Sequence, residues 1–286
     1  MKLVTFQKSG SPPAIGLVVE AGIVDLSRHL QPSVASMTAL MERWADLRPA
    51  VERLANAPAD VPLEAATLLA PVLRPGKIMG IGLNYADHVE ESGLPKPDKQ
   101  LWFAKMSSAA NAPYGMFELP LASSALDYAA ELAVVIGKRC KHVSREHAKD
   151  VIFGFCAAND VSVRDWQLST SQFVLGKSFD THAPFGPWIV TPDEVGDPHT
   201  LDIRCTVNGE ERQASNTRYM VFDCYAQIEH LSQAMTLEPG DVILTGTPGG
   251  VGAAMKPPRY LKAGDVVAVT IERIGEIRHT VTPEAR

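Results

Sequence analysis

Short apolar segments separated by turn residues dominate this chain, and they restrict its fold more than any other feature. Extended segments are predicted at residues 78–82, 132–137, 188–190, 203–207, 242–245 and 266–271, and Asn208-Gly209 is a typical hairpin turn. Helical patterns are fewer and irregular, at residues 85–91, 145–151 and 221–235. A doubly wound parallel sheet needs regular strand–helix alternation, so the pattern predicts an α+β fold with large mixed sheets.

The first part of the chain has its own pattern of short strands followed by a helix. Extended runs are predicted at residues 2–6, 15–19 and 23–26, and apolar residues recur at helical spacing over 37–54, with an interruption expected near Pro49. Prolines at positions 58, 62, 71 and 75 then interrupt any regular helix or strand pattern. We therefore predict a small α+β amino-terminal domain over residues 1–70 and a larger domain over residues 71–286.

Composition and charge favour a soluble protein that acts on a small molecule. The chain has 286 residues, 45% of them hydrophobic and 21% charged, with a net charge of −6 and no dense Lys/Arg cluster. Nucleic acids and anionic membranes are therefore poor partners. No apolar run is long enough for a membrane span, and the amino terminus becomes polar at Gln7, too early for a signal peptide. We expect a cytoplasmic protein, and the absence of a CxxC pair predicts four unbonded cysteines.

Two carboxylates stand at the ends of apolar segments. Glu131 leads the strand at 132–137, and Asp160 follows the apolar run at 153–158. Residues two apart on a strand share a face, so Ala129 looks the same way as Glu131 and leaves a methyl group where a second carboxylate would complete a pincer. Two carboxylates with several waters suit Mg²⁺ or Mn²⁺. The alternative for Glu131 is an exposed carboxylate at a strand end.

His88 and Glu91 lie three residues apart, which places them on one face of a helical turn. A carboxylate beside an imidazole raises its basicity and fixes its tautomer, as a general base requires. The alternative is an incidental ion pair on a surface helix.

Three further polar residues are candidates for binding an anionic substrate. Arg164 and Gln167 could clamp a carboxylate or keto oxygen, although Arg164 could equally pair with Asp160 or Asp165. Lys177 could stabilise a developing oxyanion, or it could be an ordinary surface lysine.

The main glycine-rich loop covers residues 245–252. It lacks the Lys-Ser/Thr ending of a phosphate-binding loop, and no dinucleotide fingerprint follows a strand, so nucleotide binding is disfavoured. A rigid turn that presents the Thr247 hydroxyl and backbone N–H groups to a substrate is the better interpretation.

Together these segments resemble the fumarylacetoacetate hydrolase family, in particular its acylpyruvate hydrolase-like members, over about residues 76–280. The markers, in the family's order, are Gly82-Leu83-Asn84-Tyr85 with His88 and Glu91, Asp127-Tyr128 with Glu131-Leu132, Asn159-Asp160-Val161-Ser162 with Arg164-Asp165, Gly176-Lys177-Ser178-Phe179-Asp180, Ser215-Asn216-Thr217, and the 245–252 loop. Each marker alone is weak, but their shared order makes the resemblance specific.

The resemblance implies a mixed-sheet β-roll, usually dimeric, with a divalent metal bound by residue 129, Glu131 and Asp160. It makes His88 and Glu91 the dyad that activates a water, and it makes Lys177 together with Arg164, Gln167 and Thr247 the groups that hold the substrate or its oxyanion. Typical family substrates are 2,4-diketo acids, which are cleaved at a carbon–carbon bond to pyruvate and a carboxylic acid with the metal as Lewis acid.

The family pattern has glutamate at the position of Ala129. The absence of this carboxylate should weaken metal binding and activity. The chain is then either a deliberately disabled variant or a natural degenerate member, and the intact state of every other marker favours the first. Our leading hypothesis is a metal-dependent hydrolase of an acylpyruvate or a 2,4-diketo-3-deoxy sugar acid. The alternatives are oxaloacetate decarboxylation or dienoate isomerisation on the same fold, and a non-catalytic binding protein.

Overall fold

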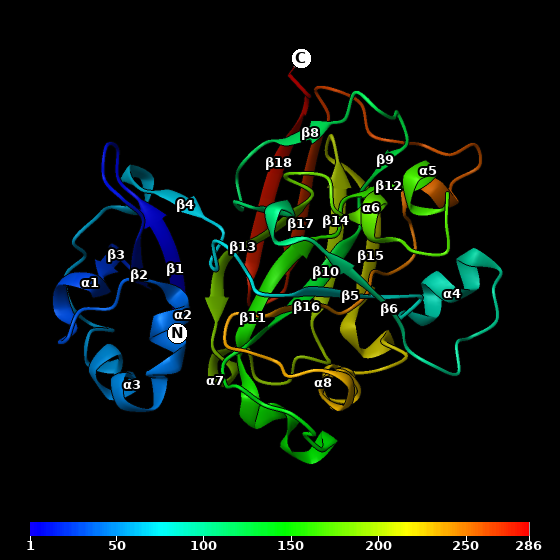
Figure 1. Cartoon of the computed structure of the whole chain (residues 1–286). Helices are drawn as coiled ribbons and strands as arrows, with labels where there is room; N and C mark the ends of the chain where they lie inside the picture. Colours follow the sequence, from blue (N-terminus) through cyan, green and yellow to red (C-terminus); the bar gives the residue numbers. More distant parts are fainter. Residues whose placement is uncertain (286) are drawn as a thin grey trace.

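One sheet of eleven strands extends through the molecule in the computed structural model, which describes residues 1–285. Its main path runs β3-β2-β1-β13-β11-β10-β16-β5-β6, with β4 added beside β1 and β7 beside β13. A second sheet has the order β15-β14-β17-β18-β8, and β9 and β12 form a separate pair. Figure 1 shows the second sheet lying beside the central strands of the first. Because β16 pairs parallel with β5 but antiparallel with β10, the large sheet is mixed, as predicted.

The strands have the following bounds: β1 Lys2–Gln7, β2 Ala14–Val19, β3 Gly22–Asp25, β4 Thr67–Leu69, β5 Ile78–Gly82, β6 Leu101–Lys105, β7 Ala110–Asn111, β8 Phe117–Leu119, β9 Leu126–Asp127, β10 Ala130–Ile136, β11 Ile152–Asn159, β12 Ser162–Val163, β13 Ala183–Val190, β14 Asp202–Val207, β15 Glu210–Asn216, β16 Val242–Leu244, β17 Val266–Ile271 and β18 Gly275–Pro283. The helices are α1 Leu26–His29, α2 Met37–Glu42, α3 Trp44–Arg53, α4 Ala86–Ser92, α5 Arg164–Gln167, α6 Val174–Lys177, α7 Pro192–Val195 and α8 Cys224–Ala234. Single 3₁₀ segments are η1 Leu63–Ala65, η2 Ser107–Ala109, η3 Arg145–Val151, η4 Thr217–Tyr219 and η5 Gly252–Ala254.

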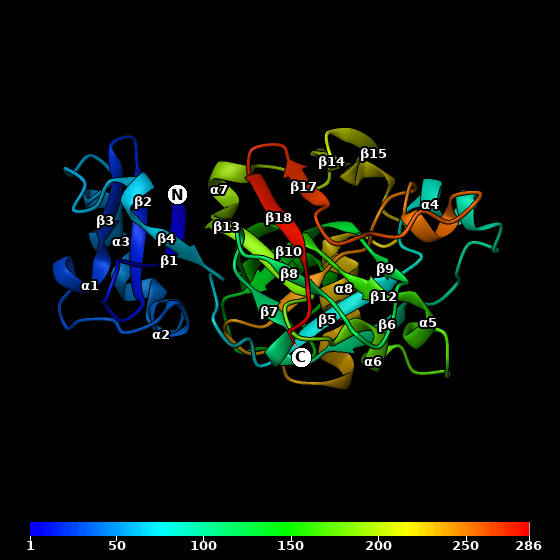
Figure 2. The same cartoon turned by 90° about the horizontal axis from the view of Figure 1, so that it is seen from above.

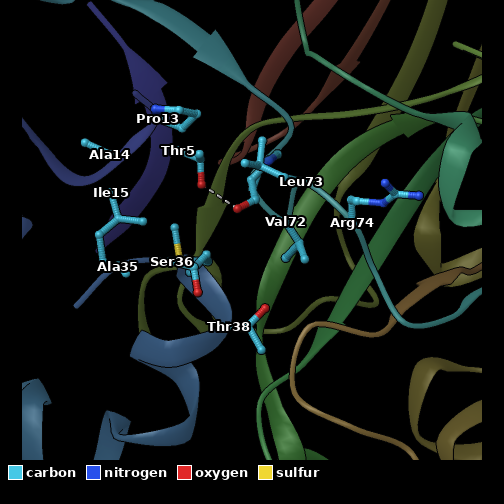
Figure 3. Close-up of a pocket in the computed structure, with 12 residues that line it drawn as sticks. Thr5, Pro13, Ala14, Ile15, Ala35, Ser36, Thr38, Val72, Leu73 and Arg74 are labelled. Atoms are coloured by element: carbon cyan, nitrogen blue, oxygen red, sulfur yellow. Dashed lines mark hydrogen bonds between the residues drawn. The ribbon is translucent and has the colours of Figure 1, made fainter. Parts of the chain in front are cut away.

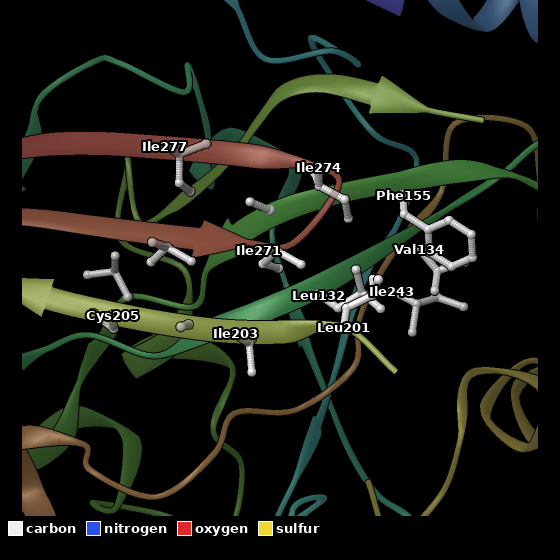
Figure 4. Close-up of a cluster of buried hydrophobic side chains, with 14 of the residues drawn as sticks. Leu132, Val134, Phe155, Leu201, Ile203, Cys205, Ile243, Ile271, Ile274 and Ile277 are labelled. Carbon is white, nitrogen blue, oxygen red and sulfur yellow. The ribbon is translucent and has the colours of Figure 1, made fainter. Parts of the chain in front are cut away.

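The largest apolar core lies between the two big sheets. Leu132 and Val134 of β10 pack there with Phe155 of β11, opposite Ile203 of β14 and Ile271 of β17 (Figure 4). Burying these side chains supplies the main stabilisation of the roll, at roughly 25 cal/mol for each Å² of apolar surface.

Alternation along β10 and β11 determines where the predicted carboxylates lie. Even-numbered residues of β10, such as Leu132, face the core between the sheets, whereas Ala133 and Val135 belong to a second core on the opposite face. Glu131 shares that opposite face because side chains alternate along a strand. The Asp160 N–H donates to the Ala129 carbonyl at 2.8 Å, so Asp160 lies directly across from residue 129. Both carboxylates therefore emerge together, away from the five-stranded sheet.

The amino-terminal strands extend the large sheet. Lys2 and Leu3 of β1 pair with Val190 and Ile189 of β13, and residues up to about 70 lie to one side of the remainder (Figure 2). A cavity of about 120 Å³ lies where this part meets residues 71–74, and in its wall the Thr5 hydroxyl donates to the Pro71 carbonyl at 2.6 Å (Figure 3). The domain boundary at residue 70 stays a prediction.

The expected helix over 37–54 is broken, but not at the expected residue. The break between α2 and α3 is at Arg43, and Pro49 lies inside α3. The missing N–H of proline removes a single bond in the second turn, and Leu47 and Val51 on either side are buried against the second core, which keeps the helix continuous. The predicted helix at 145–151 is also wound more tightly than expected, as the 3₁₀ segment η3.

Two other expectations concern chemistry outside the fold itself. The four cysteines are unbonded, with Cys140 half-buried and the others buried. Within residues 1–285 no helix is both long and apolar enough to cross a membrane.

Two buried histidines, His182 and His279, lie near the ring of Phe117 and predict a pH dependence of stability. Nε2 of His182 bonds the Glu118 carbonyl at 2.7 Å, and Nε2 of His279 bonds the Ala112 carbonyl at 2.8 Å. Burial lowers the pKa of each imidazole to about 4 from its ordinary value of 6.5. The neutral rings thus favour the folded state above pH 6.5, and this stability is lost as pH falls through 4.

We expect the free energy of unfolding to fall between pH 6.5 and 4 with a slope of up to about 2.7 kcal/mol per pH unit, the limit for two extra protons bound by the unfolded chain. Urea titrations at successive pH values measure this slope. The variant His279→Gln keeps a donor for Ala112 and should lower the slope by about half. A flat profile in this window would contradict the prediction.

Candidate active site

A cavity of about 250 Å³ opens beside the carboxyl-terminal ends of β5 and β11 and the start of β10. Eight of the nine predicted site residues line it, namely His88, Ala129, Glu131, Asp160, Arg164, Gln167, Lys177 and Thr247. The ninth, Glu91, is bonded to His88. Apolar side chains of Leu83, Leu94, Leu101, Phe103, Leu168 and Phe173 form the rest of the wall. Residues as far apart in the chain as His88 and Thr247 thus meet at one concave site.

Glu131 is almost completely buried. Its Oε2 accepts the backbone N–H of Gly246 at 2.7 Å. Burial, and then the nearby charge of Asp160, raise the pKa of this carboxyl well above its usual range. The Gly246 contact requires φ of 100°, and a Cβ there would lie 2.7 Å from the Cβ of Asn84. Glycine at this position therefore allows the loop to approach Glu131.

Asp160 is held by two lysines. Nζ of Lys105 donates to its Oδ1 at 2.7 Å and to the Val161 carbonyl at 2.9 Å, while Nζ of Lys177 binds Oδ2. Burial alone would raise the pKa of Asp160, but the two ammonium groups outweigh it and lower the pKa to about 2. Burial lowers the pKa of Lys105 to about 8 against the opposing attraction of Asp160.

Lys105 was missed in the sequence. Its signal was a lysine that ends the otherwise apolar strand β6, but its partner lies 55 residues away. Lys177 is better placed for substrate, because it lines the cavity while its Nζ lies 4.4 Å from the Phe103 ring centroid. The surface-lysine alternative for Lys177 is therefore wrong.

Lys177 is positioned by close packing of α6 against α5. A Cβ on Gly176 would lie 2.2 Å from the backbone nitrogen of Gln167, so only glycine lets these two short helices approach this closely. The same contact brings Gln167 and Lys177 to one wall of the cavity.

The His88–Glu91 pair forms as the spacing predicted. Nδ1 of His88 lies 3.2 Å from Oε2 of Glu91, and Oε1 of Glu91 accepts the Gly250 N–H at 2.9 Å. Both side chains are largely shielded, with 16% and 26% of their surface exposed. The carboxylate holds one ring nitrogen, which leaves Nε2 to exchange a proton within the cavity.

Arg164 has a partner that the sequence did not suggest. Its Nε donates to Asp127 Oδ2 at 2.8 Å and its Nη1 to Gln167 Oε1 at 3.0 Å, so neither Asp160 nor Asp165 is its partner. Asp127 also accepts the backbone N–H groups of Gly252 and Ala253 at 2.8 and 3.0 Å. It thereby ties Arg164 to the glycine-rich loop.

The Thr247 hydroxyl also lines the cavity. Its Oγ1 accepts from Nε2 of Gln213 at 2.8 Å, while Oε1 of Gln213 accepts the Ala130 N–H at 2.9 Å. Because Oγ1 accepts from Gln213, its own proton is free to be donated to a ligand.

The protein alone offers a metal ion few oxygens. Within residues 1–285 no three His, Cys, Asp or Glu side chains form a cluster that could hold one. Glu131 and Asp160 remain, and the methyl group of Ala129 stands where a third carboxylate would be. Mg²⁺ in proteins often retains several waters and is held by one or two carboxylates together with oxygens of the substrate. The pair therefore fits a hard divalent cation that takes most of its ligands from elsewhere.

The sequence of residues 77–282 matches the family model for the fumarylacetoacetate (FAA) hydrolase C-terminal domain. The chain belongs to the fumarylacetoacetate hydrolase family. This match covers well over half of the chain, and the mixed α+β architecture agrees with solved members of the fold.

Relatives within this family carry out several reactions. The chain is 44% identical over 287 aligned residues to the mitochondrial oxaloacetate tautomerase FAHD2A of Bos taurus, covering 98% of this chain and 91% of that protein. A maleylpyruvate hydrolase from Sphingobium sp. SYK-6, solved in complex with manganese(II) ion and pyruvate, is 34% identical with a TM-score of 0.84 and complete coverage of both chains. A 2-hydroxyhepta-2,4-diene-1,7-dioate isomerase from Mycobacterium marinum is 32% identical with a TM-score of 0.78, also with complete coverage.

Proposed function

We propose that this chain catalyses keto–enol tautomerisation of a short 2-oxo dicarboxylic acid of the oxaloacetate class. The observation that carries the proposal is one cavity in which an imidazole backed by a carboxylate and a buried ammonium group both line the wall. Tautomerisation needs a base at C3 and a positive or hydrogen-bonding group at the C2 oxygen, and no activated water. The likeness to an oxaloacetate tautomerase over 98% of this chain supports the same substrate class.

In the proposed reaction, His88 Nε2 removes a proton from C3 of the keto form. The electron pair of the C–H bond becomes the C2–C3 double bond, and the C2 oxygen takes the charge of the broken carbonyl π bond. Lys177 and the Thr247 hydroxyl donate to that oxygen, which then gains a proton to become the enol. No atom other than a proton enters or leaves.

The remaining groups hold the substrate. Arg164, fixed by Asp127 and Gln167, offers its remaining N–H groups to a carboxylate. A divalent cation held by Glu131 and Asp160 would supply Lewis acidity at the C2 oxygen. The resemblance to a manganese-containing maleylpyruvate hydrolase supports a cation of this kind, and Mg²⁺ and Mn²⁺ are both candidates.

Carbon–carbon hydrolysis of an acylpyruvate, the reaction expected first from the sequence, is the second candidate. The His88–Glu91 dyad favours it, because the same base could activate a water. Tautomerisation makes fewer demands on a site that lacks one carboxylate, and for that reason we place it first.

Homodimer formation and a cytoplasmic location likewise stay proposals, and the curated relative is described as mitochondrial.

The purified protein should accelerate loss of the enol absorbance of oxaloacetate, and exchange of its C3 hydrogens in D₂O, above the uncatalysed rate. Pyruvate release from acylpyruvates, coupled to lactate dehydrogenase, tests hydrolysis, and pyruvate release from oxaloacetate tests decarboxylation. Pyruvate from acylpyruvates without enol exchange would favour hydrolysis over tautomerisation. Failure of all assays with Mg²⁺ and Mn²⁺ would favour the non-catalytic alternative.

Replacing the base should abolish most of this activity. We expect His88→Ala to lower kcat/KM for enol exchange by about 100- to 10,000-fold, the usual contribution of general acid–base catalysis. His147→Ala is a matched control, because His147 faces Asp150 at the same three-residue spacing and the same 3.2 Å separation but is exposed. An equal loss in both variants would contradict a catalytic role for His88.

A further inference from the structure

The buried ionic groups beside the cavity have formal charges that cancel. With all four groups ionised, Glu131 and Asp160 contribute two negative charges and Lys105 and Lys177 contribute two positive ones, and the raised pKa of Glu131 shifts this group further toward positive charge. A glutamate at position 129 would leave this group with one negative charge. With alanine there, no net charge attracts a divalent cation into a buried site, where removal of water from the ion is costly.

The two lysines are firmly placed against Asp160. Lys105 is fully buried and has a second acceptor in the Val161 carbonyl. Lys177 stacks over Phe103, with 5% of its side chain exposed. Each oxygen of Asp160 therefore already accepts one ammonium group, and Oε2 of Glu131 accepts the Gly246 N–H. An incoming cation meets only the lone pairs that these contacts leave.

An anionic ligand in the cavity would supply the negative charge and the oxygen ligands that a divalent cation lacks here. Ala129 is among the residues that line the cavity, so a ligand in the cavity can approach the place where a glutamate side chain at this position would enter. A 2-oxo dicarboxylate brings two negative charges and adjacent oxygens that chelate a hard cation. Its oxygens can supply both the charge and the coordination that position 129 lacks.

We propose that this chain binds a divalent cation tightly only together with a chelating anionic ligand, which replaces the carboxylate absent at position 129. The proposal rests on the proposed function for the substrate class. Metal and ligand affinities are then coupled, and each must strengthen the other by the same factor.

The test is a Mn²⁺ titration of the intact protein, in which the spectrum of free Mn²⁺ is followed by electron paramagnetic resonance with and without oxalate, each measured against a protein-free titration at the same oxalate concentration. We expect oxalate to lower the apparent Kd for Mn²⁺ by about tenfold or more, within the usual range of coupling between two ligands. Calorimetric titration with oxalate should show the same factor when Mn²⁺ is added. Neither readout requires turnover.

Two variants separate charge from coordination. Ala129→Glu should bind Mn²⁺ without oxalate and show a smaller oxalate effect, whereas Ala129→Gln adds an oxygen without charge and should stay close to the parent. Mn²⁺ affinity in the parent chain that is unchanged by oxalate would overturn the inference and leave the proposed function standing. If oxalate and Mn²⁺ bind to neither the parent nor Ala129→Glu, singly or together, the inference and the proposed function both fail.

Discussion

Replacing Lys177 by methionine is expected to lower kcat/KM for enol exchange by about 100- to 1,000-fold, which is the usual loss when a preorganised oxyanion donor is removed. The ammonium group is held in a nearly dry wall between Asp160 and the Phe103 ring, where its charge is screened little by water. Methionine retains the length and apolar surface of the side chain, so the contact with Phe103 should survive. The loss would then report on charge and hydrogen bonding at the C2 oxygen.

A second measurement on Lys177→Met guards against a merely structural explanation. Removing one ammonium group takes away a positive charge that repels the cation, so Mn²⁺ should bind more tightly while turnover falls. Damage to the fold would weaken both. Lys141→Met is the control for a lysine elsewhere, because Lys141 is exposed and donates only to the Ala234 carbonyl, at 3.2 Å. Unchanged turnover in Lys177→Met would exclude the proposed role.

The largest effect on stability is expected at Asp160. Asp160→Asn removes the carboxylate to which both buried ammonium groups are hydrogen-bonded, and breaking a buried ion pair in this way costs about 3–5 kcal/mol. Asparagine has nearly the shape of aspartate, so the cost would come from charge. Urea unfolding at pH 7 measures it, with Lys105→Met and the double variant Asp160→Asn with Lys105→Met completing a thermodynamic cycle.

The double variant decides the interpretation, because it removes one of the two uncompensated charges. We expect it to be more stable than Asp160→Asn alone, and simple additivity of the two single losses would contradict the ion-pair explanation.

The low pKa of Asp160 also predicts how the free energy of unfolding changes in acid. Its folded pKa of about 2 lies below the ordinary 3.8, so its contribution is complete above pH 4 and disappears as pH falls towards 2.

Local patterns in the sequence predicted much of the sheet. The bounds of β5 and β17 match the expected strands, and Asn208-Gly209 forms the expected hairpin between β14 and β15 with positive φ at both residues. These features depend on short-range alternation and on turn residues. The position of the helix break near Pro49 was wrong, because tertiary packing of α3 outweighed a single lost hydrogen bond.

The predicted site residues came together, but their partners could not be predicted. Asp127 meets Arg164 from 37 residues away, and Lys105 meets Asp160 from 55 residues away. No periodicity encodes such pairs, because the register of the sheet and the path of the loops create them. The charge balance of the site, on which its metal chemistry depends, was therefore hidden until both lysines were placed.

The hydrogen bonds around β10 also show what a change of side chain would disturb at each of the three expected ligand positions. Glu131 holds the Gly246 N–H and Asp160 holds two lysines, so losing either carboxylate would disturb the loop or leave charges stranded. Residue 129 contributes only its backbone to the surrounding bonds, accepting from Asp160 N and donating to Asn159 Oδ1. The side chain at this position can therefore be exchanged without breaking any of these hydrogen bonds, so a substitution there changes the chemistry of the cavity and leaves the surrounding backbone in place.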